Sequence, residues 1–163
     1  MVGHVNEADL EWDELETGET RFRRKRLGWA ADAEQLGASL YELPAGARSW
    51  PFHYHTANEE AIYVLAGTGT LRTADGGQAL ERGDFVALPT GEEGGHRVVN
   101  TGEEPLRYLC VSTMQEPDVT VYPDSGKLGI FAGAPPGGDS AARTVDGYYP
   151  RDAAVDYWDG EER

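Results

Sequence analysis

The stretch that decides the fold reads GARSWPFHYHTANEEAIYVLAG over residues 46–67. Residues i and i+2 of a β-strand lie on the same face, so we expect His53 and His55 to point the same way. A short connection over residues 56–59 leads into a second predicted strand, which begins at Glu60 and returns a carboxylate to the same place. Two imidazoles and one carboxylate on one side of a sheet are a typical ligand set for a divalent metal ion.

Glu59 is the alternative carboxylate in this stretch. If Glu60 points inward, the alternation of the strand also places Ile62 and Val64 on the interior face. We therefore favour Glu60 as the ligand and expect Glu59 to be a solvated loop residue.

A second informative stretch reads GDFVALPTGEEGGHRVVN over residues 83–100. A turn built on Pro89 and the following glycines leads into a predicted strand that opens with His96, a third imidazole. A single histidine in a strand is more often structural than functional. Here three of the four histidines of the chain fall into one pattern, which favours a common site.

These two stretches resemble the two motifs of the cupin superfamily. The first motif is matched by Gly46, His53, His55, Glu60 and Gly67, with one extra residue before the first histidine. The second motif is matched by Gly83, Pro89, Gly91, His96 and Asn100, with two extra residues between Gly91 and His96. The resemblance covers residues 36 to 113, and the longer spacing could tilt the last histidine without changing its identity.

The resemblance implies a double-stranded β-helix, or jelly-roll, barrel that holds one divalent metal ion. The implied ligands are His53, His55, Glu60 and His96. Iron, manganese, zinc and nickel all remain open as the metal, and no catalytic acid or base is identified beyond the ligands. The alternative is a barrel that keeps these side chains without a metal, or binds a metal only for structure.

The rest of the chain fits an all-β domain with extensions at both ends. Short stretches rich in β-branched and aromatic residues alternate with Gly, Pro, Asp and Asn, and Asp75-Gly76-Gly77 is typical of a tight hairpin. The predicted strands lie near 22–28, 36–43, 48–55, 60–66, 69–73, 78–81, 84–88, 96–100, 106–113 and 118–122. We predict an acidic N-terminal arm over 1–20, the barrel over 21–131, and a Gly/Pro linker with an acidic aromatic tail over 132–163.

The composition limits the partners of the protein. Asp and Glu number 29 against 14 Lys and Arg, for a formal net charge of −15. Such a charge repels nucleic acid and anionic membranes, and an acidic chain with few lysines is typical of a halophilic source. The sequence shows no apolar run long enough to span a bilayer and no signal-peptide pattern, so we expect a soluble cytoplasmic protein. Cys110, the single cysteine, allows no internal disulfide and is expected to be an inert core residue.

Strand alternation also predicts an apolar outer face. If the histidines point inward, the residues between them and their neighbours on the next strand point outward, and this set contains Trp50, Phe52, Tyr54, Tyr63 and Leu65. An apolar face of this size is expected to be covered, either by the N-terminal segment or by a second copy of the chain. We favour a homodimer through this face, because two-fold pairing is the commonest closed arrangement.

One basic run, Arg21-Phe-Arg-Arg-Lys-Arg26, departs from the acidic composition. The favoured interpretation is a charged edge strand that pairs with nearby acids and discourages aggregation. The alternative is an anion or phosphate site near the mouth of the barrel.

Three functions are compatible with this sequence. The first is a metal-dependent enzyme that acts on a small organic substrate, by sugar-phosphate isomerase-like or dioxygenase-like chemistry. The second is a non-catalytic, metal-dependent module that binds a sugar or another small ligand. The third is an oligomerisation scaffold, which we disfavour; no helix-turn-helix pattern precedes the barrel, so a DNA-binding regulator is disfavoured as well.

Overall fold

The computed structural model describes residues 2–161 and contains mostly β-strands. The helical elements are η1 (Glu7–Asp9), α1 (Leu27–Ala30), η2 (Glu92–Gly94) and η3 (Ser140–Ala142). The strands are β1 (Asp13–Thr17), β2 (Thr20–Arg26), β3 (Leu36–Leu43), β4 (Tyr54–His55), β5 (Glu60–Ala66), β6 (Thr68–Thr73), β7 (Gly76–Glu81), β8 (Phe85–Leu88), β9 (Arg97–Val99), β10 (Leu106–Thr113), β11 (Asp118–Tyr122), β12 (Lys127–Ala132) and β13 (Val145–Pro150). The predicted all-β fold is confirmed. None of the helices among the described residues is long and apolar enough to cross a membrane.

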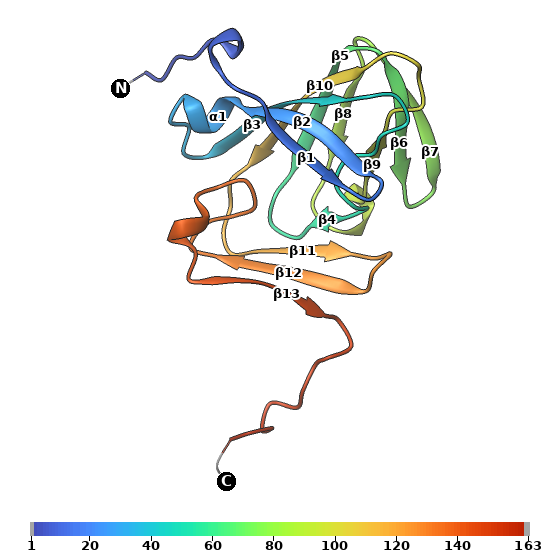
Figure 1. Ribbon diagram of the computed structural model, residues 1–163. Helices are drawn as coiled ribbons and strands as arrows, with labels where there is room; N and C mark the ends of the chain where they lie inside the picture. Colours follow the sequence, from blue (N-terminus) through green and yellow to red (C-terminus); the bar gives the residue numbers. More distant parts are fainter. Residues whose placement is uncertain (1, 162–163) are drawn as a thin grey trace.

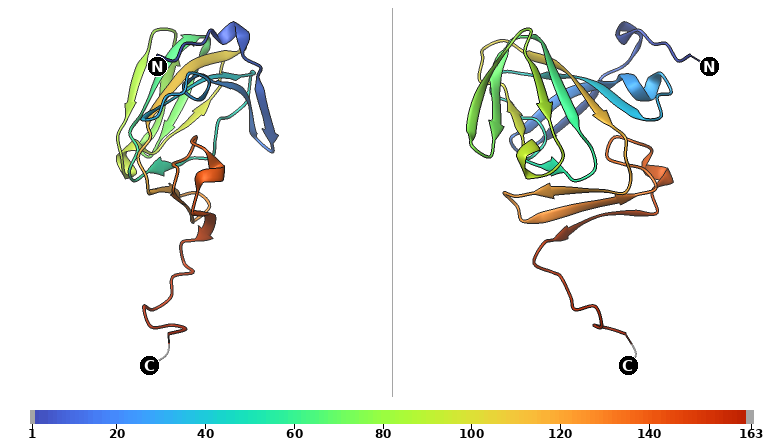
Figure 2. Two further views of the ribbon diagram at one scale, coloured as in Figure 1. Left: turned by 90° about the vertical axis from the view of Figure 1, so that its left-hand side faces the viewer. Right: turned by 180° about the vertical axis from the view of Figure 1, so that it is seen from behind.

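Three antiparallel sheets build the molecule. The largest has the strand order β1-β2-β3-β10-β5-β8, and a smaller sheet has the order β7-β6-β9. A third sheet, in the order β13-β12-β11-β4, lies across one end of the other two (Figure 1). The same arrangement is seen from behind in Figure 2, where the C-terminal segment after β13 runs away from the body. Strand β4 belongs to this third sheet and therefore connects the C-terminal region to the centre of the barrel.

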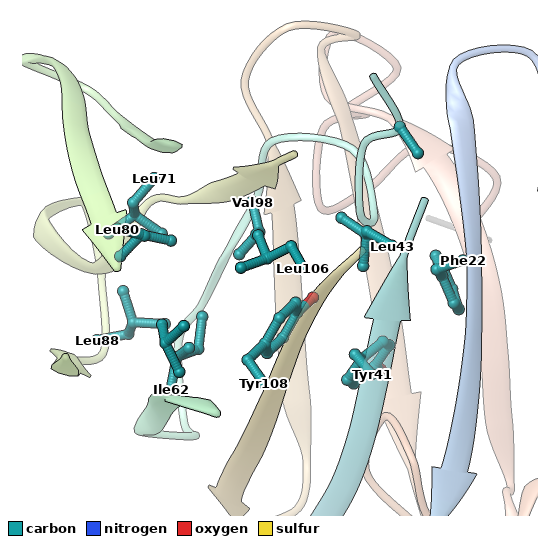
Figure 3. Close-up of a cluster of buried hydrophobic side chains, with 12 residues drawn as sticks. Phe22, Tyr41, Leu43, Ile62, Leu71, Leu80, Leu88, Val98, Leu106 and Tyr108 are labelled. Atoms are coloured by element: carbon teal, nitrogen blue, oxygen red, sulfur yellow. The ribbon is translucent and has the colours of Figure 1, made fainter. Parts of the chain in front are cut away.

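The core lies between the six-stranded and three-stranded sheets (Figure 3). Alternate residues of β3, β5 and β10 face it, and Leu43, Val64 and Leu106 are fully buried there. Leu71 of β6 and Val98 of β9 close the core from the opposite side. The period-2 pattern of the sequence therefore corresponds to an inward apolar face on each of these strands.

Four predicted strands agree with the structure residue for residue: 36–43, 60–66, 106–113 and 118–122. The predicted strand 48–55 differs, because only Tyr54 and His55 form a continuous ladder there. Residues 48 and 53 make isolated bridges on either side of Pro51, which has no backbone N–H to donate. The chain is therefore extended but irregular before the histidines.

This irregularity corrects the predicted outer face. Phe52 is only 5% exposed, and Trp50 packs against the core with its indole N–H donated to the Tyr41 hydroxyl. Simple alternation placed both rings outside, and it fails because no continuous ladder spans this segment. Tyr63 and Leu65, on the regular strand β5, are 43% and 38% exposed as expected. The homodimer through this face stays a prediction, and the exposed apolar surface available for it is smaller than the sequence suggested.

Both termini contribute more structure than the sequence suggested. The predicted arm contains β1, which pairs with β2, so β2 is an interior strand and its interpretation as an edge strand is wrong. The predicted acid pairs are present, with Arg23 bound to Glu42 on the outer face of this strand. The region assigned to linker and tail contains β13, which pairs with β12 along its whole length. Both strands lack strong alternation because one or both of their faces are solvated.

Candidate metal centre

Four side chains converge at the centre of the barrel. Glu60 lies at the start of β5, His55 in β4, and His53 and His96 are joined backbone to backbone by an antiparallel bridge. The Oε2 atom of Glu60 lies 3.4 Å from Nε2 of His96 and 3.7 Å from Nε2 of His55. Ligand atoms of His53, Glu60 and His96 all lie within 4.8 Å of one another, and the ring of His53 lies 5.1 Å from that of His55. The structure thus brings together all four side chains that the sequence predicted as ligands.

Backbone carbonyls fix the tautomers of two of these rings. Nδ1 of His53 lies 2.7 Å from the carbonyl oxygen of Pro51, and Nδ1 of His96 lies 2.9 Å from that of Gly94. A carbonyl oxygen can only accept, so each Nδ1 carries the proton and donates it. In the neutral ring each Nε2 then presents a lone pair, which is the state a metal ion requires.

Asp118, which lies far from His55 in the sequence, fixes the tautomer of His55 in the same way. It is fully buried at the start of β11, and its Oδ2 atom lies 2.6 Å from Nδ1 of His55. The backbone N–H of Ala57 donates to its second oxygen at 2.9 Å, and the hydroxyl of Thr120 lies 3.2 Å from the same ring nitrogen. A carboxylate that orients a histidine from behind is a recurrent feature of metal sites. The sequence reasoning missed Asp118; the available signal was an acid that opens the apolar strand 118–122.

The three histidines of the site differ in the direction of their pKa shifts. Burial lowers the pKa of His53 well below its usual value, and the neighbouring His96 and His55 lower it further. Burial also lowers the pKa of His96, against the opposing effect of Glu60. Burial lowers the pKa of His55 too, but the hydrogen bond to Asp118 and the charge of Glu60 outweigh it, so its pKa is raised. Two of the rings are therefore held neutral by the fold itself.

The extra residues before His96 form a compact turn. They lie in η2, where the N–H of Gly94 bonds back to the carbonyl of Gly91, and the N–H of Gly91 donates to the carbonyl of His55 at 2.8 Å. Gly91 has a φ of 84°, which favours glycine. Backbone hydrogen bonds join the start of the turn to His55 and join His96, at its end, to His53. The two extra residues therefore do not move the His96 imidazole away from the centre of the barrel.

Glu59, the last loop residue before β5, is exposed, as expected for a loop acid. Cys110 lies closer, with its Sγ atom 3.9 Å from Oε1 of Glu60, and burial raises the pKa of its thiol well above the usual value. The thiol is therefore held protonated beside the cluster. Two imidazole nitrogens and one carboxylate oxygen, from His53, His96 and Glu60, lie close enough together to hold a metal ion, and Nε2 of His55 lies 3.7 Å from the same carboxylate. Such donors suit zinc, iron, manganese or nickel.

The cluster forms part of the wall of a cavity of about 680 Å³. All four predicted ligands line it, together with side chains from the inner face of the six-stranded sheet and from the C-terminal sheet. Tyr122 of β11 stacks on His53 with 5.8 Å between the ring centres. Cavities of this size hold small organic molecules, so the site combines a ligand set with space for a substrate.

Comparison with known proteins points to one family. The cupin domain family matches residues 39–112. L-ectoine synthase from Mycobacterium sp. (strain KMS) is 33% identical over 107 residues, which cover 64% of this chain and 78% of that protein. An uncharacterized protein of Methanocaldococcus jannaschii, MJ1618, is 30% identical over 70 residues, or 43% of this chain; the match spans only 54% of that relative's length.

Solved structures agree on the fold. A putative sugar phosphate isomerase from Acidithiobacillus ferrooxidans superposes with a TM-score of 0.77 at 24% identity, over 91% of this chain and 90% of that chain. A sugar phosphate isomerase from a cupin superfamily, from Silicibacter pomeroyi, gives 0.76 at 24% identity, over 96% and 98%. At this identity the likeness shows the fold alone: the jelly-roll barrel, together with most of the N- and C-terminal extensions.

Proposed function

Since this chain belongs to the cupin superfamily, we propose that it is a metal-dependent enzyme that acts on a small organic substrate inside its barrel. The observation that carries the proposal is the convergence of His53, His55, His96 and Glu60 on the wall of a cavity. A purely structural metal site is usually closed by its protein ligands, whereas a catalytic site faces the space that a substrate fills.

The chain's own residues define what such a site does. The three Nδ1 hydrogen bonds hold the imidazoles in the tautomer that directs Nε2 toward Glu60. A metal bound there would act as a Lewis acid toward a substrate oxygen, or would activate dioxygen if it is iron. The three histidines are each less than a tenth exposed, so water screens electrostatic interactions at their ring nitrogens only weakly.

Similarity to enzymes supports catalysis over a scaffold role. The curated relative that shares 33% identity is a synthase, and two structures with the same fold are described as sugar phosphate isomerases. Isomerase-like and dioxygenase-like chemistry use the same ligand set, so the identity of the metal separates them. Iron favours oxygen chemistry, whereas manganese or zinc favours isomerisation.

The test begins with elemental analysis of the full chain purified without oxygen. We expect a stoichiometric divalent metal in the wild type and in His4→Ala, a control at an exposed histidine outside the site. We expect background metal in His96→Ala. The metal-loaded protein is then assayed for sugar-phosphate isomerisation and for substrate-dependent oxygen uptake. Equal metal content in wild type and His96→Ala would overturn the site, and ligand-induced stabilisation without turnover would identify a binding module instead.

A further inference from the structure

The basic strand β2 turns two of its arginines toward the cavity. Backbone pairing places Arg24 opposite Tyr41, and Tyr41 opposite Tyr108, in one row across β2, β3 and β10. Paired residues of neighbouring strands lie on the same face of a sheet. Tyr41 and Tyr108 are core residues, so Arg24 lies on the inner face, and it lines the same cavity as the metal centre.

A second row leads from the next arginine to the metal centre itself. Arg26 pairs with Ser39, and Ser39 pairs with Cys110. The thiol of Cys110 lies 3.9 Å from Oε1 of Glu60. The two arginines and the metal ligands are thus at two ends of one continuous inner surface.

Two of the cations on the outer face of β2 have partners within the protein, unlike Arg24. Arg23 is bound to Glu42 at 2.6 Å. Lys25 is buried under the N-terminal segment, where its Nζ atom donates to the carbonyl of Glu7 at 2.6 Å and lies over the ring of Trp12. These outward side chains have structural partners.

Arg24 has no carboxylate within hydrogen-bond distance among the described residues. Its nearest acid is Asp13, whose Oδ2 lies 4.0 Å from Nε of Arg24 and only 3.0 Å from Nε of Arg26. The Arg24 side chain is 20% exposed and its guanidinium lies 5.5 Å from the ring centre of Trp50. The guanidinium also lies within hydrogen-bonding reach of the Tyr41 hydroxyl, and the donors that remain can bind a planar acid group.

Two other charged groups of the cavity wall have partners within the protein. Arg143 donates to the carbonyls of Ala134 and Pro135, and Glu116 accepts from the backbone N–H of Gly133. At the β2 end the two inward arginines are accompanied by Asp13 and by the exposed Glu34, so the local charge is balanced, and Arg24 is the guanidinium that has no directly bound acid. This local balance contrasts with the net charge of −15 on the whole chain, which repels anions at long range.

We propose that the substrate is a small organic anion whose carboxylate or phosphate group binds Arg24, with Arg26 beside it, while its remaining oxygens extend toward the metal centre. This inference rests on the proposed function, because it assigns the second end of the same substrate cavity. The hydroxyls of Tyr41 and Ser39 and the face of Trp50 provide the neutral lining next to the acid group. The two guanidiniums select for charge, and the metal ligands select for oxygen donors.

The test uses the metal-depleted full chain, so that an added anion cannot bind a metal. Melting temperatures are measured with inorganic phosphate, acetate and chloride at equal ionic strength, because salt alone stabilises an acidic protein by screening. We expect phosphate or acetate to raise the melting temperature beyond chloride in the wild type and in Arg21→Gln, an exposed residue on the outer face of the same strand. We expect Arg24→Gln to weaken this binding about tenfold or more, since it removes a charged hydrogen-bond donor.

Arg26→Gln provides a second inner-face variant should Arg24→Gln fold poorly, and we expect a smaller loss because Asp13 already binds Arg26. The preferred anion separates a carboxylate ligand from a phosphate ligand. Equal anion binding in wild type and both inner-face variants, or no response to either anion beyond chloride, would overturn the inference. Metal content, measured on the same variants before depletion, is expected to be unchanged. Failure of metal binding with intact anion binding would instead count against the proposed function alone.

Discussion

The two ends of the cavity are held by different forces. At the metal end, His53 makes an isolated bridge, His55 lies in a two-residue strand and His96 follows a turn, and one or two hydrogen bonds at Nδ1 orient each ring. At the other end, β3 and β10 pair over eight residues, and Tyr41 and Tyr108 stack with their ring centres 5.3 Å apart.

The difference shows how stability and function are divided. In a continuous ladder with a packed face, many contacts each contribute to the free energy of unfolding, so the sheet end sets the stability of the fold. The metal end depends on a few polar contacts, each of which fixes one ligand. Substitutions at the two ends should therefore change different measured quantities, and the predictions below, from the largest effect to the smallest, test this separation.

His96→Ala should give the largest effect at the metal end. Loss of one of four ligands removes stoichiometric metal binding, and the melting temperature of metal-loaded preparations falls because bound metal stabilises the folded state. Far-UV circular dichroism is expected to be unchanged. Elemental analysis and thermal melts check this, and a collapse of the β-sheet signal would show that the two ends are not separable.

Leu43→Ala tests the sheet end. Leu43 is fully buried in β3, and truncation of a buried leucine destabilises a protein by about 2–5 kcal/mol through lost burial and the cavity left behind. Urea unfolding of the metal-depleted chain measures the change in the free energy of unfolding. The folded variant should still bind a stoichiometric amount of metal, and loss of metal at full folding would contradict the comparison.

Asp118→Ala probes the support behind the metal end. Loss of a carboxylate that orients a ligating histidine weakens metal binding by about 10–100-fold, as seen for comparable outer contacts. Asp118→Asn should weaken it less, because its amide oxygen can still accept from Nδ1 of His55. Asp124→Asn, at an exposed acid paired with Arg72, serves as the control. Competition with a metal-binding dye measures the affinities, and equal values for all three variants would show that β11 plays no part in the centre.

Alkaline pH should act on the sheet end. Burial raises the pKa of Tyr108 well above 10.0 and that of Cys110 well above 9.0, and it raises the pKa of Tyr41 as well. Above these ordinary values the unfolded chain releases protons that the folded chain keeps, so the free energy of unfolding falls as pH rises. This stability is fully present below about pH 9, since the unfolded groups are then protonated too.

Urea unfolding of the metal-depleted chain across the alkaline range measures this slope. Tyr108→Phe removes one of the titrating groups and should flatten the slope, whereas Tyr157→Phe, at an exposed tyrosine of the tail, should leave it unchanged. A free energy of unfolding that stays constant through the alkaline range would show that these groups are not buried in solution.

The sequence identified the parts of the site that lie in local patterns. The His53 and His55 pair follows the period of a strand, and Glu60 follows from the phase that also buries Ile62 and Val64. His96 was found through its spacing from a turn, and the structure accommodates the two extra residues of that spacing in η2.

Long-range pairing decided what the sequence could not. Asp118 meets His55 across 63 residues of chain, a separation that no local period reveals. Trp50 packs against the core and Phe52 is buried, because the segment before the histidines lacks the ladder on which alternation depends. Only the register of β2 with β3 shows which side of β2 faces the cavity. The sequence does not predict it, because cations occur on both faces of this strand.

The sequence by itself thus determined the all-β class and which four side chains are suited to meet, because both depend on residue type at strand and turn spacing. Only the tertiary structure decided which groups hydrogen-bond to those side chains, such as Asp118, and which residues line the other end of the cavity, such as Arg24. The physical reason is that second contacts and cavity walls arise between strands distant in the chain, and their pairing is fixed by the packing of the whole core.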